Sequence, residues 1–225
     1  MNKKIFNFIN LAIFLLVISG DVWFILTESI LAKSLTSSLF VIMAGINLFY
    51  AIKTKSANIK FCIAMIAGLF FAMLGDILLE VDFITGAVLF AVGHIGFFIS
   101  YCFLIKFSWF DIIAGSIIFI PSVLFITLAP IFEFDPSILK VLCALYAVVI
   151  SCMLGKAIVN FIRTRNLLNL LLVLGSFLFF FSDLMLLLDN FAALPAVFGV
   201  LCLATYYPAE CLLAYSILQS ANDEK

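Results

Sequence analysis

Long apolar runs alternate with short polar segments along the chain. Each run is close to the roughly 20 apolar residues that a helix needs to cross the hydrocarbon core of a bilayer. Only "EVD" separates the third run from the fourth, so these two should form a tight antiparallel pair. The pattern predicts an all-α polytopic bundle of eight transmembrane helices, at about residues 5–26, 33–52, 60–80, 83–105, 109–131, 138–161, 166–188 and 193–218.

The composition agrees with this pattern and limits the class of protein. Hydrophobic residues make up 66% of the 225 positions and charged residues 11%, with a mean hydropathy of +1.32. No soluble domain of this size has so little polar surface. We therefore expect one integral membrane domain over residues 1–225, surrounded by membrane lipids. A net charge of −1 without a basic patch argues against a nucleic-acid partner, and homo-oligomerisation is left open.

The six cysteines all lie in apolar runs and show no CxxC spacing. Such residues are typical of small buried or lipid-facing positions rather than of disulfides or metal sites. His94 is the single histidine, and one histidine cannot build a multi-histidine zinc centre. We therefore expect neither a metal nor another cofactor.

Lysine and arginine residues are distributed unevenly between the two sides of the predicted bundle. The first run follows two lysines, as in a signal peptide, but it is long enough to span and lacks a small-residue cleavage site, so we expect a first helix. With the N-terminus inside, only Lys33 and Lys140 lie outside, and the positive-inside rule then predicts cytoplasmic termini, in a bacterial inner membrane. The inner residues are Lys3, Lys4, Lys53, Lys55, Lys60, Lys106, Lys156, Arg163, Arg165 and Lys225.

Two parts of the chain resemble each other. "GDILLEVD" at 75–82 aligns with "SDLMLLLD" at 182–189, an offset of 107, and "YAIKTK" at 50–55 echoes "NFIRTR" at 160–165, an offset of 110. The matches join the third run to the seventh and the second to the sixth. They suggest a parallel four-plus-four repeat, with halves at about 1–106 and 107–225.

The repeat places a carboxylate, Asp76 or Asp183, near one end of each of two apolar runs. An ionisable group inside a membrane span is costly and therefore a candidate for function. Asp21 and Lys33 lie at a similar depth, so four such groups from four helices share one end of the bundle. The alternative is a structural clamp in which the aspartates pair with Lys33.

Neighbouring residues favour a site over a clamp. Each aspartate follows a small residue, Gly75 or Ser182, which allows close approach of another helix or a lipid headgroup. Each is also followed by a second acid, Asp82 or Asp189, that is better placed to meet water. Two carboxylates on one cavity can hold different protonation states and act as acid and base. The same pair suits a proton carrier, so it does not by itself select an enzyme.

Further polar residues occur in the fourth and eighth runs. His94 and Tyr101 are seven residues apart and share a helix face, and Tyr206 and Glu210 do so at a spacing of four. The simpler interpretation of His94 is a hydrogen bond between helices. The simpler interpretation of Glu210 is a protonated side chain that forms a hydrogen bond to another helix. Ser182 and Asp183 point about 100° apart on a helix, which argues against a catalytic pair made of these neighbours.

Several of these segments together resemble the YhhN-like lysoplasmalogenase family. They are "LGDILL", "FAVGHIGFFISY", "LYAVVISCML", "FFFSDLMLL" and "TYYPAECLLAY", and the resemblance covers nearly the whole chain. "LAKSLTSSL" is similar to that family's Lys-Pro-Leu start of the second span, with Ser34 in place of Pro. Glu210 stands where a Gln is usual.

The resemblance implies an eight-helix hydrolase that cleaves the vinyl ether bond of lysoplasmalogens, or of a related lysophospholipid ether, without a metal. The products are a fatty aldehyde and a glycerophospho-base. Asp76 and Asp183 match the family's paired aspartates and are the expected catalytic residues, with Asp183 as acid and Asp76 as base or the reverse. The expected substrate-binding residues, matched to the family or chosen by position, are Lys33, His94, Tyr206, Asp21, Tyr101 and Ser182.

Two other functions remain open at this stage. A small-molecule or proton-coupled transporter also uses intramembrane acids and internal repeats, but it predicts polar groups at mid-depth and broken helices at matching repeat positions. A non-catalytic lipid-binding protein needs no carboxylate pair and should tolerate Asp76→Asn.

Overall fold

The computed structural model describes residues 2–54 and 58–221, so Lys55 and Lys225 of the charge count lie outside the described residues. Eight helices in these ranges are long and apolar enough to cross a membrane, which confirms the all-α membrane bundle. They are α1 (Lys3–Thr27), α2 (Ile30–Thr54), α3 (Ile59–Leu79), α4 (Phe83–Leu104), α5 (Trp109–Leu128), α6 (Ile138–Thr164), α7 (Leu167–Phe191) and α8 (Val197–Ser220).

Several helix boundaries differ by a few residues from the predicted spans, and two of them lie beside a proline. The fifth span was expected to reach residue 131, but α5 ends at Leu128. Proline disfavours helical backbone at the residue before it, and Ala129, which precedes Pro130, is extended with ψ 125°. In the same way α8 begins only after Pro195, at Val197.

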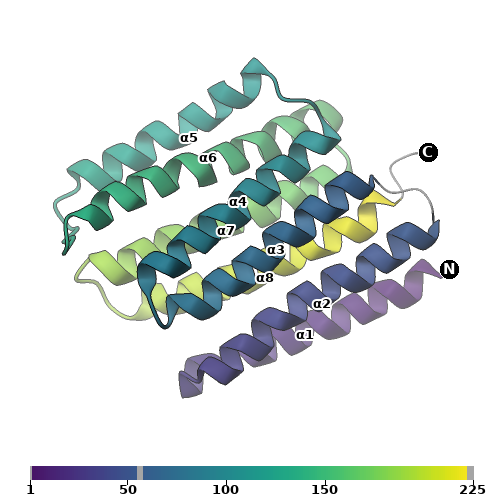
Figure 1. The fold of residues 1–225 in the computed structure, drawn as a ribbon, viewed down its shortest axis with the longest axis horizontal. Coiled ribbons are helices and arrows are strands. Elements are labelled where there is room, and N and C mark those ends of the chain that lie inside the picture. Colours follow the sequence, from purple (N-terminus) through teal and green to yellow (C-terminus); the bar gives the residue numbers. More distant parts are fainter. Residues whose placement is uncertain (1, 55–57, 222–225) are drawn as a thin grey trace.

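The helices form three groups in space (Figure 1). The central group contains α3, α4, α7 and α8, with α1 and α2 along one edge and α5 and α6 along the other. α1 begins and α8 ends at the same end of the bundle. The opposite end, which carries the α3–α4 and α7–α8 connections, is the one where the four ionisable groups were expected. Which end faces the cytoplasm stays a prediction.

Glycines bring consecutive helices into close contact. A Cβ on Gly96 of α4 would lie 2.9 Å from the Cα of Gly68 in α3, and one on Gly155 of α6 would lie 2.6 Å from the backbone nitrogen of Gly115 in α5. Helices in lipid gain little from the hydrophobic effect and associate instead through close van der Waals packing, which small residues allow. The expected tight α3–α4 pair is therefore confirmed.

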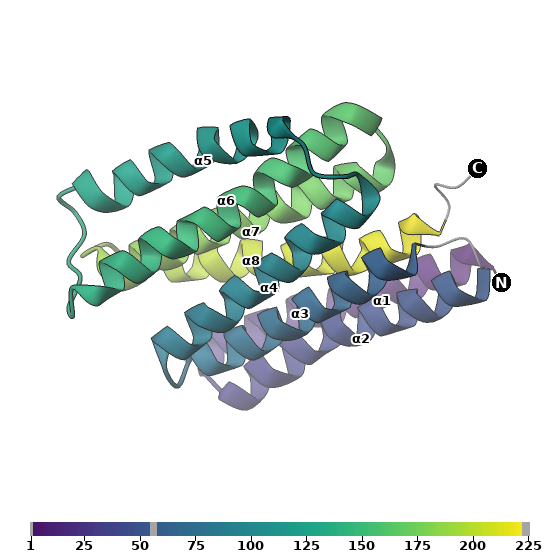
Figure 2. The same ribbon diagram turned by 45° about the horizontal axis from the view of Figure 1, so that its top comes forward.

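The two halves of the chain use matching helix contacts with two exceptions, because the α1–α8 and α3–α8 contacts have no close counterpart between α5 and α4 or between α7 and α4 in the described ranges. α2 packs on α3 and α8, and α6 correspondingly packs on α7 and α4. α1 packs on α8, whereas α5, its counterpart, makes no helix contact with α4 or α7 in the described ranges and packs on α6 alone (Figure 2). This pattern is what two related four-helix halves would give, although the duplication itself stays a prediction.

Polar contacts fix the two edge helices. The side chains of Asn10 in α1 and Asn47 in α2 donate to each other at 2.8 Å, and Asn47 also donates to the Ala214 carbonyl of α8. On the other edge, the buried Lys156 of α6 lies 3.1 Å from a carboxylate oxygen of Asp111 in α5. α1 is thus bonded into the centre of the bundle, and α5 is bonded to α6.

Candidate active site

A polar cavity of about 470 Å³ opens at the end of the bundle opposite the chain termini. It is lined by side chains from five helices, α1, α2, α3, α7 and α8, and by the first turns of α4. Asp76 and Asp183 both line it, although they are 107 residues apart in the chain. The sequence indicated only that the two aspartates lie at a similar depth in the membrane. The structure shows that they also lie at the same cavity.

Asp76 lies near the end of α3 and is held by groups from α2 and α8. Its Oδ1 is 3.2 Å from the Lys33 ammonium. Its Oδ2 accepts hydrogen bonds from the Ser37 hydroxyl and, at 3.0 Å, from the Tyr207 hydroxyl. The side chain is 4% exposed. A buried carboxylate with a cation and two hydroxyl donors has the surroundings of an ionised group.

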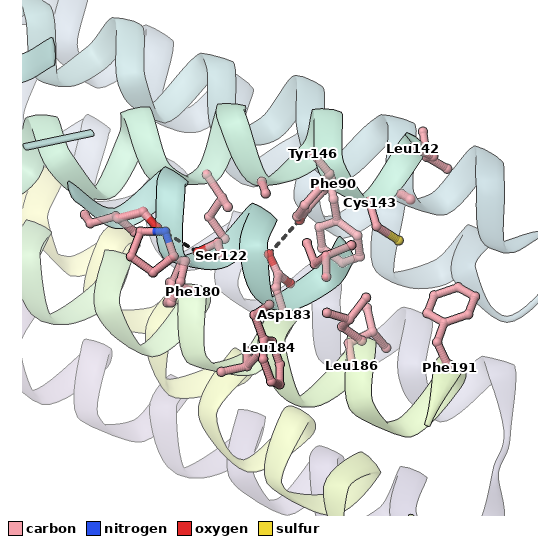
Figure 3. A pocket seen from close by; sticks show the side chains of 18 of the residues that line it. Phe90, Ser122, Leu142, Cys143, Tyr146, Phe180, Asp183, Leu184, Leu186 and Phe191 are labelled. Atoms are coloured by element: carbon pink, nitrogen blue, oxygen red, sulfur yellow. Dashed lines mark hydrogen bonds between the residues drawn. The ribbon is translucent and has the colours of Figure 1, made fainter. Parts of the chain in front are cut away.

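Asp183 lies in α7 and is held by groups from α6 and α4. The Tyr146 hydroxyl donates to its Oδ2 at 2.6 Å, and Figure 3 shows the carboxylate directed at that hydroxyl. The Nε2 of the fully buried His94 is 3.1 Å from the same oxygen and 2.7 Å from the Tyr146 oxygen. Among the described residues, no Lys or Arg forms an ion pair with Asp183.

The two carboxylates therefore have related positions but different partners. Each accepts a hydrogen bond from a hydroxyl on the preceding helix, Ser37 or Tyr146, and each contacts one group from the last helix of the other half, Tyr207 or His94. Only Asp76 has a lysine partner. The two carboxylates therefore meet different electrostatic surroundings at otherwise similar positions.

Acidic side chains surround the mouth of the polar cavity. Glu28, Glu80 and Asp189 line it and are exposed, and Lys33 is the single Lys or Arg among the lining residues that the structure describes. Lys33 also contacts Glu80. Asp82, the other second acid of the repeat, is exposed outside this cavity and caps the N-terminus of α4.

Asp82 serves a local structural purpose. Its carboxylate accepts hydrogen bonds from the side chain and the backbone N–H of Thr85. These two bonds lower the pKa of Asp82, because they stabilise the ionised form. Asp82 and Asp189 are both exposed, as expected for interfacial acids.

An apolar pocket of about 380 Å³ lies beside the polar cavity, among α4, α5, α6 and α7. Asp183 lines both spaces, together with Phe83, Phe90 and Leu186, and Figure 3 shows it among the side chains of the apolar pocket. The rest of the pocket wall is largely aliphatic and aromatic. Asp183 thus stands where a polar space and an apolar space meet.

Most of the expected binding residues lie at this site. Lys33, Tyr206 and Ser182 line the polar cavity, and His94 touches Asp183 without lining either space. Tyr206 donates to the Ala72 carbonyl, and Ser182 donates to the Cys202 carbonyl at 2.9 Å. Asp21 is buried within electrostatic range of Asp76 and Lys33 but does not line the cavity.

Tyr101 was expected at the site, and the structure places it elsewhere. Seven residues along a helix amount to about 10 Å, so sharing a face with His94 does not bring Tyr101 to the same depth. Its hydroxyl pairs with Ser176 at 2.8 Å in the core, and its carbonyl accepts from Asn160. It lines neither space.

Glu210 also differs from expectation. It is fully buried, but neither carboxyl oxygen has a hydrogen-bond partner among the described residues. The cross-helix hydrogen bond that its position suggested is therefore absent.

Three hydroxyl residues that hold the aspartates were missed. Ser37 lies one helical turn after Lys33, so its presence on the same face was predictable. Tyr207 directly follows the expected Tyr206, and Tyr146 lies within the family-like segment "LYAVVISCML". No cluster of three or more His, Cys, Asp and Glu side chains suited to a metal occurs within residues 2–54 and 58–221.

Comparison with known proteins decides the family. The model of the YhhN family matches residues 28–217, which cover all the residues that hold the two aspartates. The chain belongs to the YhhN family. No curated protein and no solved structure matches the chain significantly. A proposal for its function therefore rests on three findings, namely its membership in the YhhN family, its eight membrane helices and the geometry of the two aspartates.

Proposed function

We propose that this YhhN-family protein is a membrane hydrolase that cleaves the vinyl ether bond of lysoplasmalogens, or of a closely related lysophospholipid ether. One observation carries the proposal: the buried Asp76 and the half-buried Asp183 line a single cavity, Asp76 paired with a lysine and Asp183 with a tyrosine and a histidine. Vinyl ether hydrolysis needs an acid that protonates carbon and a carboxylate that stabilises a cation and activates water.

Asp183 is assigned as the general acid. It has no Lys or Arg partner among the described residues, and its location between the two spaces gives access to a bond between a polar headgroup and an alkenyl chain. The Tyr146 hydroxyl stabilises the carboxylate that forms when the proton leaves. His94 positions both of these groups.

Asp76 is assigned as the base. Lys33, Ser37 and Tyr207 keep it ionised and fix its orientation. From this position it stabilises the positive charge on the substrate and then accepts a proton from the attacking water.

The proton transfers balance over one cycle. Asp183 gives its proton to the second carbon of the alkenyl chain, and the first carbon with its ether oxygen becomes an oxocarbenium ion. Water adds to the first carbon while Asp76 takes a proton, which yields a hemiacetal. The hemiacetal hydroxyl then returns a proton to Asp183 as the bond to the glycerol oxygen breaks, and Asp76 protonates that oxygen. Aldehyde and glycerophospho-base leave, and both aspartates return to their starting states.

The charges at the cavity mouth suit a zwitterionic headgroup. Lys33 has three N–H donors, and its contacts with Asp76 and Glu80 use two of them. The third can bind a phosphate oxygen. The exposed carboxylates of Glu28 and Asp189 lie at the same mouth and can attract an amine.

The direct test uses detergent-purified protein, a lysoplasmalogen substrate and measurement of the fatty aldehyde. Wild type should release aldehyde, and Asp76→Asn and Asp183→Asn should abolish release while keeping the thermal midpoint. Asp82→Asn is the matched control, because Asn also caps helices well and Asp82 lies outside the cavity. Unchanged rates in both aspartate variants would exclude the catalytic assignment and favour a carrier or a lipid-binding protein.

Two further observations test the protonation at carbon. When the reaction is run in heavy water, the aldehyde should carry one deuterium on its second carbon. The background is the deuterium that unlabelled aldehyde takes up when it is incubated with the protein in heavy water, and the labelling should exceed it. A saturated alkyl ether analogue has no double bond to protonate and should not be cleaved. Cleavage of that analogue at a similar rate would contradict the mechanism.

A further inference from the structure

The contacts of α5 are one of the exceptions to the matching arrangement of the two halves. α1 is packed on α8 and tied to the bundle centre through Asn10, Asn47 and the Ala214 carbonyl. α5 occupies the matching place in the second half, yet it packs on α6 alone in the described part of the chain. The place where α5 would meet α4 is therefore not sealed by helix packing.

The apolar pocket occupies this place. Its walls come from α4 and α7 on one side and from α5 and α6 on the other. Its volume of about 380 Å³ falls in the usual range of small-ligand sites, roughly 300–1,000 Å³. Asp183 is the single Asp, Glu, Lys, Arg or His among the residues that line it in the described ranges.

The predicted repeat relates the two spaces to each other. The 110-residue offset between "YAIKTK" and "NFIRTR" places Cys143 at the position that corresponds to Lys33. Lys33 lines the polar cavity and pairs with Asp76, whereas Cys143 lines the apolar pocket beside Asp183. The second half thus keeps the carboxylate and lacks the cation.

Aromatic residues cover the end of the pocket near the membrane surface. Phe191 lines the pocket, and its ring lies 4.8 Å from that of Phe134 in the α5–α6 connection. The Glu133 N–H in the same connection donates to the Phe191 carbonyl at 2.7 Å. Phe132 meets Phe125 of α5 edge to face, with the ring centroids 5.1 Å apart. These contacts cover that end of the pocket, whereas no helix packing joins α5 to α4 at its side in the described ranges.

We propose that the apolar pocket holds the alkenyl chain of the substrate, and that the chain enters it sideways from the bilayer between α4 and α5. This inference rests on the proposed function. The occupant is a single hydrocarbon chain because the pocket is largely apolar, has the volume of a small-ligand site and shares Asp183, Phe83, Phe90 and Leu186 with the polar cavity that would hold the headgroup. A lysolipid with its headgroup at Lys33 and its chain in the pocket places the bond between them at Asp183.

The pocket acts by alignment rather than by affinity. A chain that moves from lipid tails into an apolar pocket gains little hydrophobic free energy, because both surroundings are apolar. Selection among chains must therefore be steric, since each methylene either fits the walls or clashes with them.

The first test narrows the pocket from two helices, α5 and α6, that form the same side of it. Cys143→Phe on α6 and Ser122→Phe on α5 change residues that are partly exposed to the pocket (Figure 3). Each should lower kcat/KM for a long-chain lysoplasmalogen about tenfold relative to a short-chain one. Leu145→Phe is the matched control, because Leu145 is 62% exposed on the lipid side of α6 and lines neither space. An equal chain-length profile in all three variants would overturn the proposal.

The second test does not depend on catalysis. A lysophospholipid with a photoreactive diazirine near the end of its chain is added to the protein in detergent, irradiated, and mapped by mass spectrometry. Adducts should fall on the facing sides of α5 and α6, and Cys143→Phe should reduce them. Adducts in the pocket without aldehyde release would support the pocket and refute the proposed chemistry. Aldehyde release with adducts on α1 or α8 would keep the chemistry and refute the pocket.

Discussion

Tyr146 offers the sharpest test of which aspartate is the acid. Its hydroxyl donates to Asp183 at 2.6 Å, and Tyr146→Phe removes only that hydroxyl while the ring still lines the pocket. If Asp183 gives its proton away, the hydrogen bond is between neutral groups in the ground state and to a carboxylate in the transition state. The variant then loses stabilisation that exists mainly in the transition state, so kcat should fall.

The size of this effect follows from the two kinds of hydrogen bond. A bond between neutral groups contributes about 0.5–1.5 kcal/mol and one to a charged group about 1.5–3 kcal/mol. The difference of about 1–2 kcal/mol corresponds to a decrease in kcat of about 5- to 30-fold. If Asp183 is instead ionised at the start, the hydroxyl stabilises the ground state more than the transition state, and its removal should leave kcat unchanged or raise it.

The assay is aldehyde release at saturating lysoplasmalogen, with the thermal midpoint measured in the same detergent. Tyr101→Phe is the matched control: its hydroxyl pairs with Ser176 at 2.8 Å in the core, and its side chain lines neither space. It should leave kcat within about twofold, although the Ser176 hydroxyl loses its partner, which lowers stability by about 1 kcal/mol. Equal losses in both tyrosine variants, or a Tyr146→Phe rate equal to wild type, would refute the assignment of Asp183 as acid.

Three other predictions concern helix packing, the Lys156–Asp111 ion pair and Glu210, and each is tested by measuring the thermal midpoint in detergent. Gly155→Ala should destabilise by about 1–3 kcal/mol because its Cβ would strike the α5 backbone, while Gly45→Ala, with no atom within 4 Å of the added Cβ, should stabilise by up to about 1 kcal/mol; the opposite order would contradict the packing. Lys156→Met leaves the carboxylate of Asp111 buried without its cation and should cost about 3–5 kcal/mol; an unchanged midpoint would show that the pair contributes nothing. Glu210→Gln should keep or raise the midpoint and leave aldehyde release within about threefold, because the carboxyl makes no hydrogen bond among the described residues; loss of activity at an unchanged midpoint would give Glu210 a role in the reaction.

The architecture was predictable because it depends on the length of the apolar runs. A span of about 20 residues is a one-dimensional property, and the errors at Leu128 and Val197 arose where proline sets the local backbone. The convergence of Asp76 and Asp183 was partly predictable, since the position of each in its run fixes its depth.

The partners of each aspartate were not predictable in the same way. They depend on how each helix is rotated about its axis. A sequence indicates this rotation only when the helix has one polar face and one apolar face. These helices are apolar on nearly all sides, so Tyr206 and Tyr207, about 100° apart on α8, could not be ranked. Of these two tyrosines, Tyr207 donates a hydrogen bond to Asp76, whereas Tyr206 donates to the Ala72 carbonyl. The apolar pocket depends on the missing contact between α5 and α4, which no pattern within either segment reveals.

The place of Asp183 on the boundary between the two spaces bears on how products depart. Cleavage at this point would divide an amphiphile into a water-soluble fragment beside the cavity mouth and an oily fragment already facing the bilayer. The water-soluble fragment would then leave through the cavity mouth and the oily fragment through the bilayer. Neither product would have to leave before the other. A reactive aldehyde released in this way would enter the membrane without first passing through water.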